Sequence, residues 1–127
     1  MEEKKTGSFS EKIAAFSLGL RYEDIPAPVI SYGKLLLKDT FGVAMASQKL
    51  DHIHAIGKTI EEMGGTPQAP LWGTQEQANL ANAVLYNAAL IHGADYDDTH
   101  VGAIVHPSAS VVSTAITVGE MVHADGR

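Results

Sequence analysis

Apolar residues recur at intervals of three and four along most of the chain, and this spacing constrains the fold more than any other feature. It is the spacing of one face of an α-helix, not the alternation of a strand. It predicts helices over 9–18, 27–47, 50–63, 75–92 and 108–122. Because no stretch alternates for long enough to build a sheet, we predict an all-α helical bundle.

Local signals at the ends of these stretches support the prediction. Ser8 or Ser10 can cap the first helix, and Gly64 with its glycine neighbour is a strong stop after the third. Thr74 begins a capping-box pattern that predicts the start of the fourth helix. Ser108 or Pro107 stands at the head of the last predicted helix.

Composition excludes several classes of protein. With 127 residues, 45% apolar and 19% charged, the chain can form one domain or a part of one. It has no cysteine, so disulfide scaffolds and thiolate metal sites are excluded. A net charge of −6 disfavours a nucleic-acid partner. The N-terminus lacks the apolar region of a secretory signal, and no apolar stretch is long enough to span a membrane. We therefore expect a cytoplasmic protein without a nucleic-acid or membrane partner.

The positive charges are distributed unevenly. All but one of the nine Lys and Arg residues lie at or before Lys58, and residues 59–126 contain none. An isolated domain usually mixes both signs on its surface. The asymmetry indicates a surface covered by another subunit or by a further part of the same chain, with compositional chance as the alternative.

The densest polar cluster lies between the last two predicted helices. Imidazoles and carboxylates side by side can act as acid–base groups, and the N-terminus of the following helix favours an anionic ligand. A capped, hydrogen-bonded loop is the alternative. A metal site is disfavoured because the aspartates lack the glycine and distal glutamate of a calcium loop. We therefore predict no metal and no cofactor. The cluster consists of His92, Asp95, Asp97, Asp98, Thr99, His100 and His106.

The same cluster carries a resemblance to a known family. Residues 88–100, AALIHGADYDDTH, followed by HPSA at 106–109, resemble the MmgE/PrpD family. Residues 35–44, LLLKDTFGVA, and the linker at 20–26 are also similar, so the resemblance extends from about residue 9 to 122. The family contains 2-methylcitrate dehydratase, cis-aconitate decarboxylase and iminodisuccinate epimerase.

The resemblance implies a fold and a set of site residues. Family members are far longer, with a large helical domain and a smaller α/β lid, so residues 1–127 resemble only the N-terminal part of the helical domain. By resemblance, His106 and Asp95 are catalytic, and Thr99, Asp98 and His100 bind substrate. The implied reaction is metal-free acid–base chemistry beside a carboxylate of a di- or tricarboxylate, with a 2-methylcitrate dehydratase-like enzyme as the first expectation.

Three hypotheses about function remain open at this stage. The chain is a segment of such a lyase or isomerase, inactive alone and completed by a missing C-terminal part or a partner subunit. Alternatively, it is a small helical assembly or interaction protein, or one subunit of a split enzyme. The third hypothesis is a metal-binding helical module. In each case the apolar helix faces lead us to expect a homo-oligomer.

Overall fold

The structure, a computed structural model, describes residues 7–126 and divides into two compact units between Tyr32 and Gly33. Its helices confirm the predicted all-α class, with one two-stranded sheet as the exception. None of the helices in the described part of the chain has the length and apolar character needed to cross a membrane. The elements are α1 (Phe9–Gly19), the 3-10 turn η1 (Tyr22–Asp24), α2 (Ala27–Ser47), α3 (Asp51–Met63), β1 (Ala69–Pro70), β2 (Gln77–Ala78), α4 (Leu80–His92) and α5 (Pro107–Met121).

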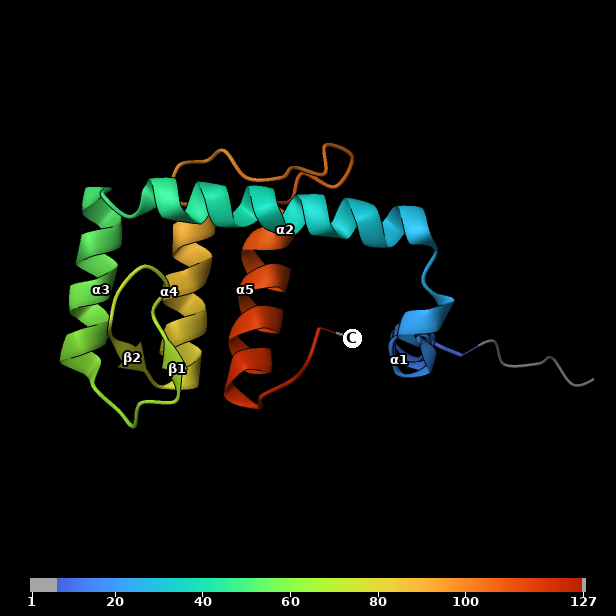
Figure 1. Ribbon diagram of the computed structural model, residues 1–127, viewed down its shortest axis with the longest axis horizontal. Coiled ribbons are helices and arrows are strands. Elements are labelled where there is room, and N and C mark those ends of the chain that lie inside the picture. Colours follow the sequence, from blue (N-terminus) through green and yellow to red (C-terminus); the bar gives the residue numbers. More distant parts are fainter. Residues whose placement is uncertain (1–6, 127) are drawn as a thin grey trace, which may run out of the picture. The chain divides into compact units, whose positions relative to one another are not determined.

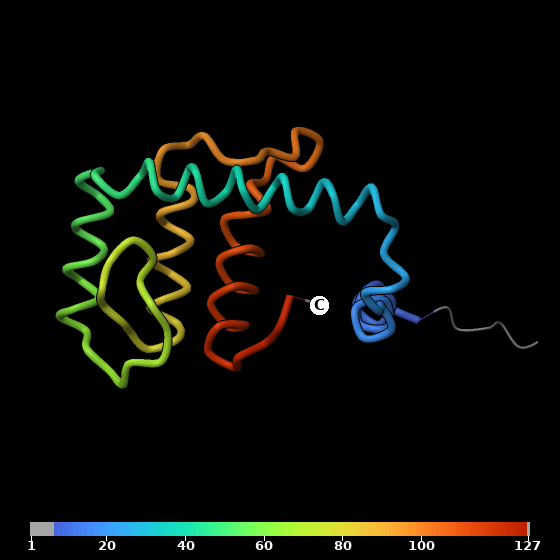
Figure 2. The backbone as a smooth tube through the Cα atoms, in the orientation of Figure 1, coloured from blue at the N-terminus to red at the C-terminus, as the bar shows by residue number. Residues whose placement is uncertain are grey.

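Three helices of the second unit stand side by side. Figure 1 shows α3, α4 and α5 in this order, with the part of α2 that follows Gly33 lying across one end of them. The tube in Figure 2 runs in opposite directions along α4 and α5, which pack closely against each other. The end of α4 and the start of α5 therefore meet at the same end of the unit, and the loop at 93–106 joins them there.

The core of this unit lies between α3, α4, α5 and the β1–β2 hairpin. Phe41 of α2 packs against Trp72 with 4.9 Å between the ring centroids, and Trp72 belongs to the buried core. The core also holds buried polar side chains, among them the fully buried Asn87, which hydrogen bonds to the hairpin and to Thr117 of α5. Its apolar members are Ala44, Ile53, Ile60, Ala69, Leu71, Trp72, Ala78, Ala83, Tyr86, Leu90, Ile91 and Val112.

Most of the predicted helix ends are confirmed. The Ser8 hydroxyl accepts from the backbone of Glu11, whose carboxylate accepts from the Ser8 backbone, forming a capping box for α1. Gly64 ends α3 with a φ of 63°, which a glycine adopts without steric cost. Pro107 occupies the first turn of α5.

The predicted start of the fourth helix is wrong. The helix begins at Leu80 and not at residue 75, because the residues before it pair with another part of the chain. Ala78 pairs with Ala69 in the small antiparallel sheet, and Thr74 forms a turn in which its hydroxyl donates to the Leu71 carbonyl. The side chain of Asn79 is the true cap of α4. Tertiary pairing therefore overrode a local capping pattern.

Candidate acid–base site

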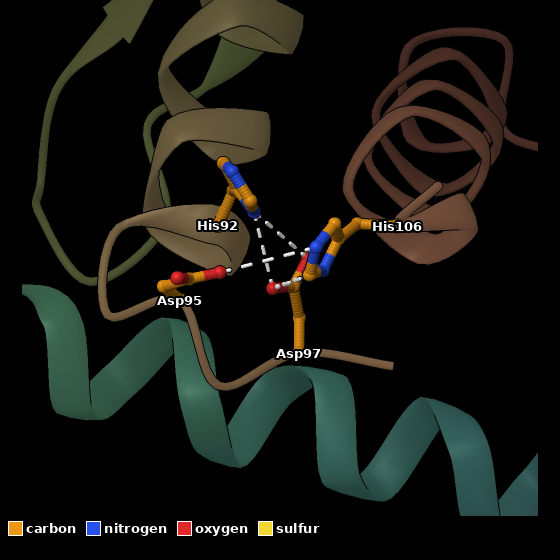
Figure 3. Close-up of side chains that lie close together, drawn as sticks. All are labelled: His92, Asp95, Asp97 and His106. Atoms are coloured by element: carbon orange, nitrogen blue, oxygen red, sulfur yellow. Dashed lines mark hydrogen bonds and ion pairs between the residues drawn. The ribbon is translucent and has the colours of Figure 1, made fainter. Parts of the chain in front are cut away.

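The site forms where α4 ends and α5 begins. His92 is the last residue of α4, and His106 precedes the first turn of α5. Asp97 comes from the loop between them, and Figure 3 shows its side chain lying between the two imidazoles. The antiparallel packing of the two helices thus brings together residues that the sequence separates by a loop.

Asp97 is the centre of the site. Its side chain is only 1% exposed, and its Oδ1 lies 3.1 Å from Nδ1 of His92 and 3.0 Å from Nδ1 of His106. A buried carboxylate is costly unless it is hydrogen-bonded, and these contacts provide its partners. The two rings lie edge to face with centroids 4.7 Å apart. One buried carboxylate therefore orients two imidazoles.

Asp95 and Thr99 lie on either side of His106. Asp95 has a left-handed backbone with a φ of 49°, and its Oδ1 lies 3.9 Å from Nε2 of His106. Its side chain is 82% exposed. The Thr99 hydroxyl lies 3.4 Å from Nδ1 of His106 and 3.3 Å from the backbone oxygen of Asp97. The structure thus brings three of the residues implied by the resemblance, Asp95, Thr99 and His106, into contact.

The remaining two predicted residues lie in contacts that shape the loop. Oδ1 of Asp98 accepts a hydrogen bond of 3.1 Å from the backbone N–H of Ser108, in the first turn of α5. That N–H is therefore already satisfied, and the carboxylate caps the helix. Nδ1 of His100 accepts from the backbone N–H of Ala103 at 3.0 Å, inside a turn closed by the pairing of His100 with Val105.

Two members of the site were not selected from the sequence. His92 and Asp97 were recognised as part of the polar cluster, but neither was predicted to be a functional residue. The available signal was the position of His92 at the end of a helix, where a cation favours the helix dipole. No local pattern indicates which of the three loop aspartates points inward.

An apolar groove leads to the two histidines. It lies between α4 and the start of α5 and has a volume of about 500 Å³. The groove is large enough for the carbon skeleton of a small molecule, and its lining includes both His92 and His106. The lining residues are Leu85, Ala88, Ala89, His92, Ile104, Val105, His106, Ala109 and Ser110.

The imidazoles and carboxylates of the site are also side chains that commonly bind metal ions. One nitrogen or carboxylate oxygen from each of His92, Asp95, Asp97 and His106 lies within 4.8 Å of the others. The prediction of no metal rested on the absence of a calcium-loop pattern and on the spacing of His92 and His100, which do not form an i,i+4 pair on a helix. The folded chain nevertheless gathers two imidazoles and two carboxylates at one point.

Fold and site together define a class of protein: an all-helical domain that carries a histidine–aspartate cluster at the junction of two antiparallel helices. The family model for the MmgE/PrpD N-terminal domain matches residues 11–127, and the chain belongs to this family. The resemblance found in the sequence is thereby confirmed. A search of curated proteins returned no match.

Proposed function

We propose that this chain supplies the acid–base groups of an MmgE/PrpD-type lyase or isomerase that acts on a di- or tricarboxylate. A 2-methylcitrate dehydratase-like reaction is the form we favour. The observation that carries the proposal is the position of His106, whose ring has the buried Asp97 on one nitrogen and the exposed Asp95 near the other.

The geometry favours His106 as the base. When Asp97 accepts a hydrogen bond from Nδ1–H, Nε2 keeps its lone pair and can take a proton from carbon. The electron pair of that C–H bond forms a carbon–carbon double bond as the C–O bond breaks, and the proton now on His106 passes to the leaving hydroxyl, which departs as water. Asp95 lies on the Nε2 side of the ring, where its charge stabilises the imidazolium that forms.

The charge distribution argues that cations beyond Lys38 of α2, which lines a pocket with Ala94 and Tyr96 of the loop, must come from elsewhere. A substrate with two or three negative charges would approach Asp95, Asp97 and Asp98, while residues 59–126 contain no Lys or Arg. Each like-charge contact at ~4 Å costs about 1 kcal/mol in water and more in a pocket. Several such contacts would cancel a millimolar affinity, which is worth about 4 kcal/mol. We therefore expect no turnover by this chain alone.

The test is a turnover assay with 2-methylcitrate, cis-aconitate and citrate. It is run on the 127-residue chain and on the chain completed by the C-terminal remainder of an MmgE/PrpD enzyme, fused or in trans. We expect activity only in the completed form, with a loss of about 100-fold or more in His106→Ala. The matched control is His54→Ala, which removes an exposed histidine of α3 and should leave turnover unchanged.

One result would contradict the expected inactivity of the chain alone, and another would contradict the acid–base role. Turnover by the 127-residue chain that disappears in His106→Ala would support the role of His106 but show that no outside cation is needed. Full activity of His106→Ala in the completed enzyme would remove the acid–base role.

A role in assembly is the second candidate function, and the exposure of α1 favours it. None of the residues of α1 is buried, and Phe9, Phe16 and Leu18 are each at least two-thirds exposed. Such a surface is typical of a segment that binds a partner. If the chain completes an active enzyme, assembly is a part of its enzymatic function. If the chain binds a partner and no activity results, assembly is its function by itself.

A further inference from the structure

We propose that His92, Asp95, Asp97 and His106 bind one divalent transition-metal ion of the zinc class. Figure 3 shows the four side chains converging from the end of α4, the loop and the start of α5. Their donor atoms all lie within 4.8 Å of one another. Two imidazole nitrogens with carboxylate oxygens suit Zn²⁺, Co²⁺ or Ni²⁺, whereas Mg²⁺ and Ca²⁺ prefer oxygen ligands alone.

The distances around Asp97 fit a metal polyhedron. In a tetrahedral site with bonds of about 2.0–2.1 Å, neighbouring ligand atoms are about 3.3 Å apart. Nδ1 of His92 lies 3.1 and 3.3 Å from the two oxygens of Asp97, and Nδ1 of His106 lies 3.0 Å from Oδ1. An ion would replace the ring protons that now make these hydrogen bonds. Even the widest separation requires each donor to move inward by only about 1 Å.

Charge and accessibility also favour an ion. The two carboxylates give the cluster a charge of about −2 when the imidazoles are neutral. Residues 59–126 include no Lys or Arg, and among the described residues no Lys or Arg forms an ion pair with Asp95 or Asp97. Asp97 is buried and fixed, while His92 is half exposed and Asp95 is mostly exposed, so an ion can enter from solvent. Asp95 lies in an exposed loop, which can adjust to become the fourth ligand.

The site is supported by contacts behind the ligands. The Thr99 hydroxyl donates to the backbone oxygen of Asp97, and Asp98 caps α5 beside His106. Contacts of this kind orient metal ligands and reduce the cost of ordering them. Ion binding does not depend on the proposed function. Inhibition by the ion, which would bind one ring nitrogen of His106 and so prevent it from acting as the base, does rest on it.

The experiment measures binding without any substrate, so its outcome is separate from that of the turnover assay. Zn²⁺ is titrated into the 127-residue chain by calorimetry, and Co²⁺ is added to record its visible absorption. We expect one ion per chain and the intense bands of four-coordinate Co²⁺. His92→Ala should weaken Zn²⁺ binding at least tenfold, whereas His54→Ala should leave it unchanged.

A second variant keeps the test decisive. Asp97→Asn should also weaken binding at least tenfold, but this residue is buried, so circular dichroism must first show that the variant folds. His92 is half exposed, so His92→Ala provides the result if Asp97→Asn does not fold. Two outcomes would overturn the proposal: absence of stoichiometric binding, or Zn²⁺ binding that is as tight in His92→Ala as in the unchanged chain.

Discussion

Replacement of Asn87 by alanine should destabilise the chain strongly, because this buried amide joins three parts of the core. Its Oδ1 accepts from the backbone N–H of Trp72 at 2.9 Å. Its Nδ2 donates to the Pro70 carbonyl at 3.2 Å and to the Thr117 hydroxyl at 3.0 Å. The residue therefore holds the hairpin and α5 against α4.

The magnitude follows from the groups that lose their partner. The Trp72 N–H and the Thr117 hydroxyl are both buried, whereas the Pro70 carbonyl is partly exposed and can accept from water. Each stranded buried group costs about 1–3 kcal/mol. We expect Asn87→Ala to lower the free energy of unfolding by about 3 kcal/mol, which corresponds to a fall of roughly 10 °C in Tm.

The assay is urea denaturation followed by circular dichroism, with Leu85→Ala as the matched control. Leu85 is on the same helix and is 54% exposed, so its truncation should change the free energy of unfolding by less than about 0.5 kcal/mol. If the free energy of unfolding of Asn87→Ala lies within about 1 kcal/mol of the wild-type value at an unchanged m-value, the argument from unpaired buried polar groups is wrong.

Three further predictions concern the cap of α5, alkaline stability and association. Asp98→Ala should lower the free energy of unfolding by about 1 kcal/mol, measured in urea, whereas Asp98→Asn, which keeps an acceptor for Ser108, should lose less than half of this. Burial, with the Glu76 carboxylate adding to it, raises the pKa of Tyr86. The folded state then keeps a proton that the unfolded chain releases, so stability is full below about pH 10 and falls above it. Tyr86→Phe should reduce the loss of unfolding free energy between about pH 9 and 11, measured by denaturation at each pH. An equal loss in the variant would show that Tyr86 does not cause it. Because α1 buries none of its residues, we expect self-association at micromolar concentration, and a monomer in sedimentation velocity with no dye-binding apolar surface would contradict this.

The sequence indicated several of the candidate site residues, but it did not indicate how they are arranged. Asp95, Thr99 and His106 were identified from the sequence and lie together in the structure. Asp97, which connects the two histidines, was not selected. Consecutive loop residues point in different directions, and only the path of the loop across the helix ends decides which carboxylate is buried.

The sequence by itself determined the helices and most of their ends. The Ser8 cap, the Gly64 stop and the proline at the start of α5 act through hydrogen bonds and dihedral preferences within a few residues, so local sequence is sufficient for them. The start of α4 and the core position of Asn87 were decided by the tertiary structure alone. A strand partner or a buried hydrogen-bond partner comes from a distant part of the chain, and no local pattern encodes its position.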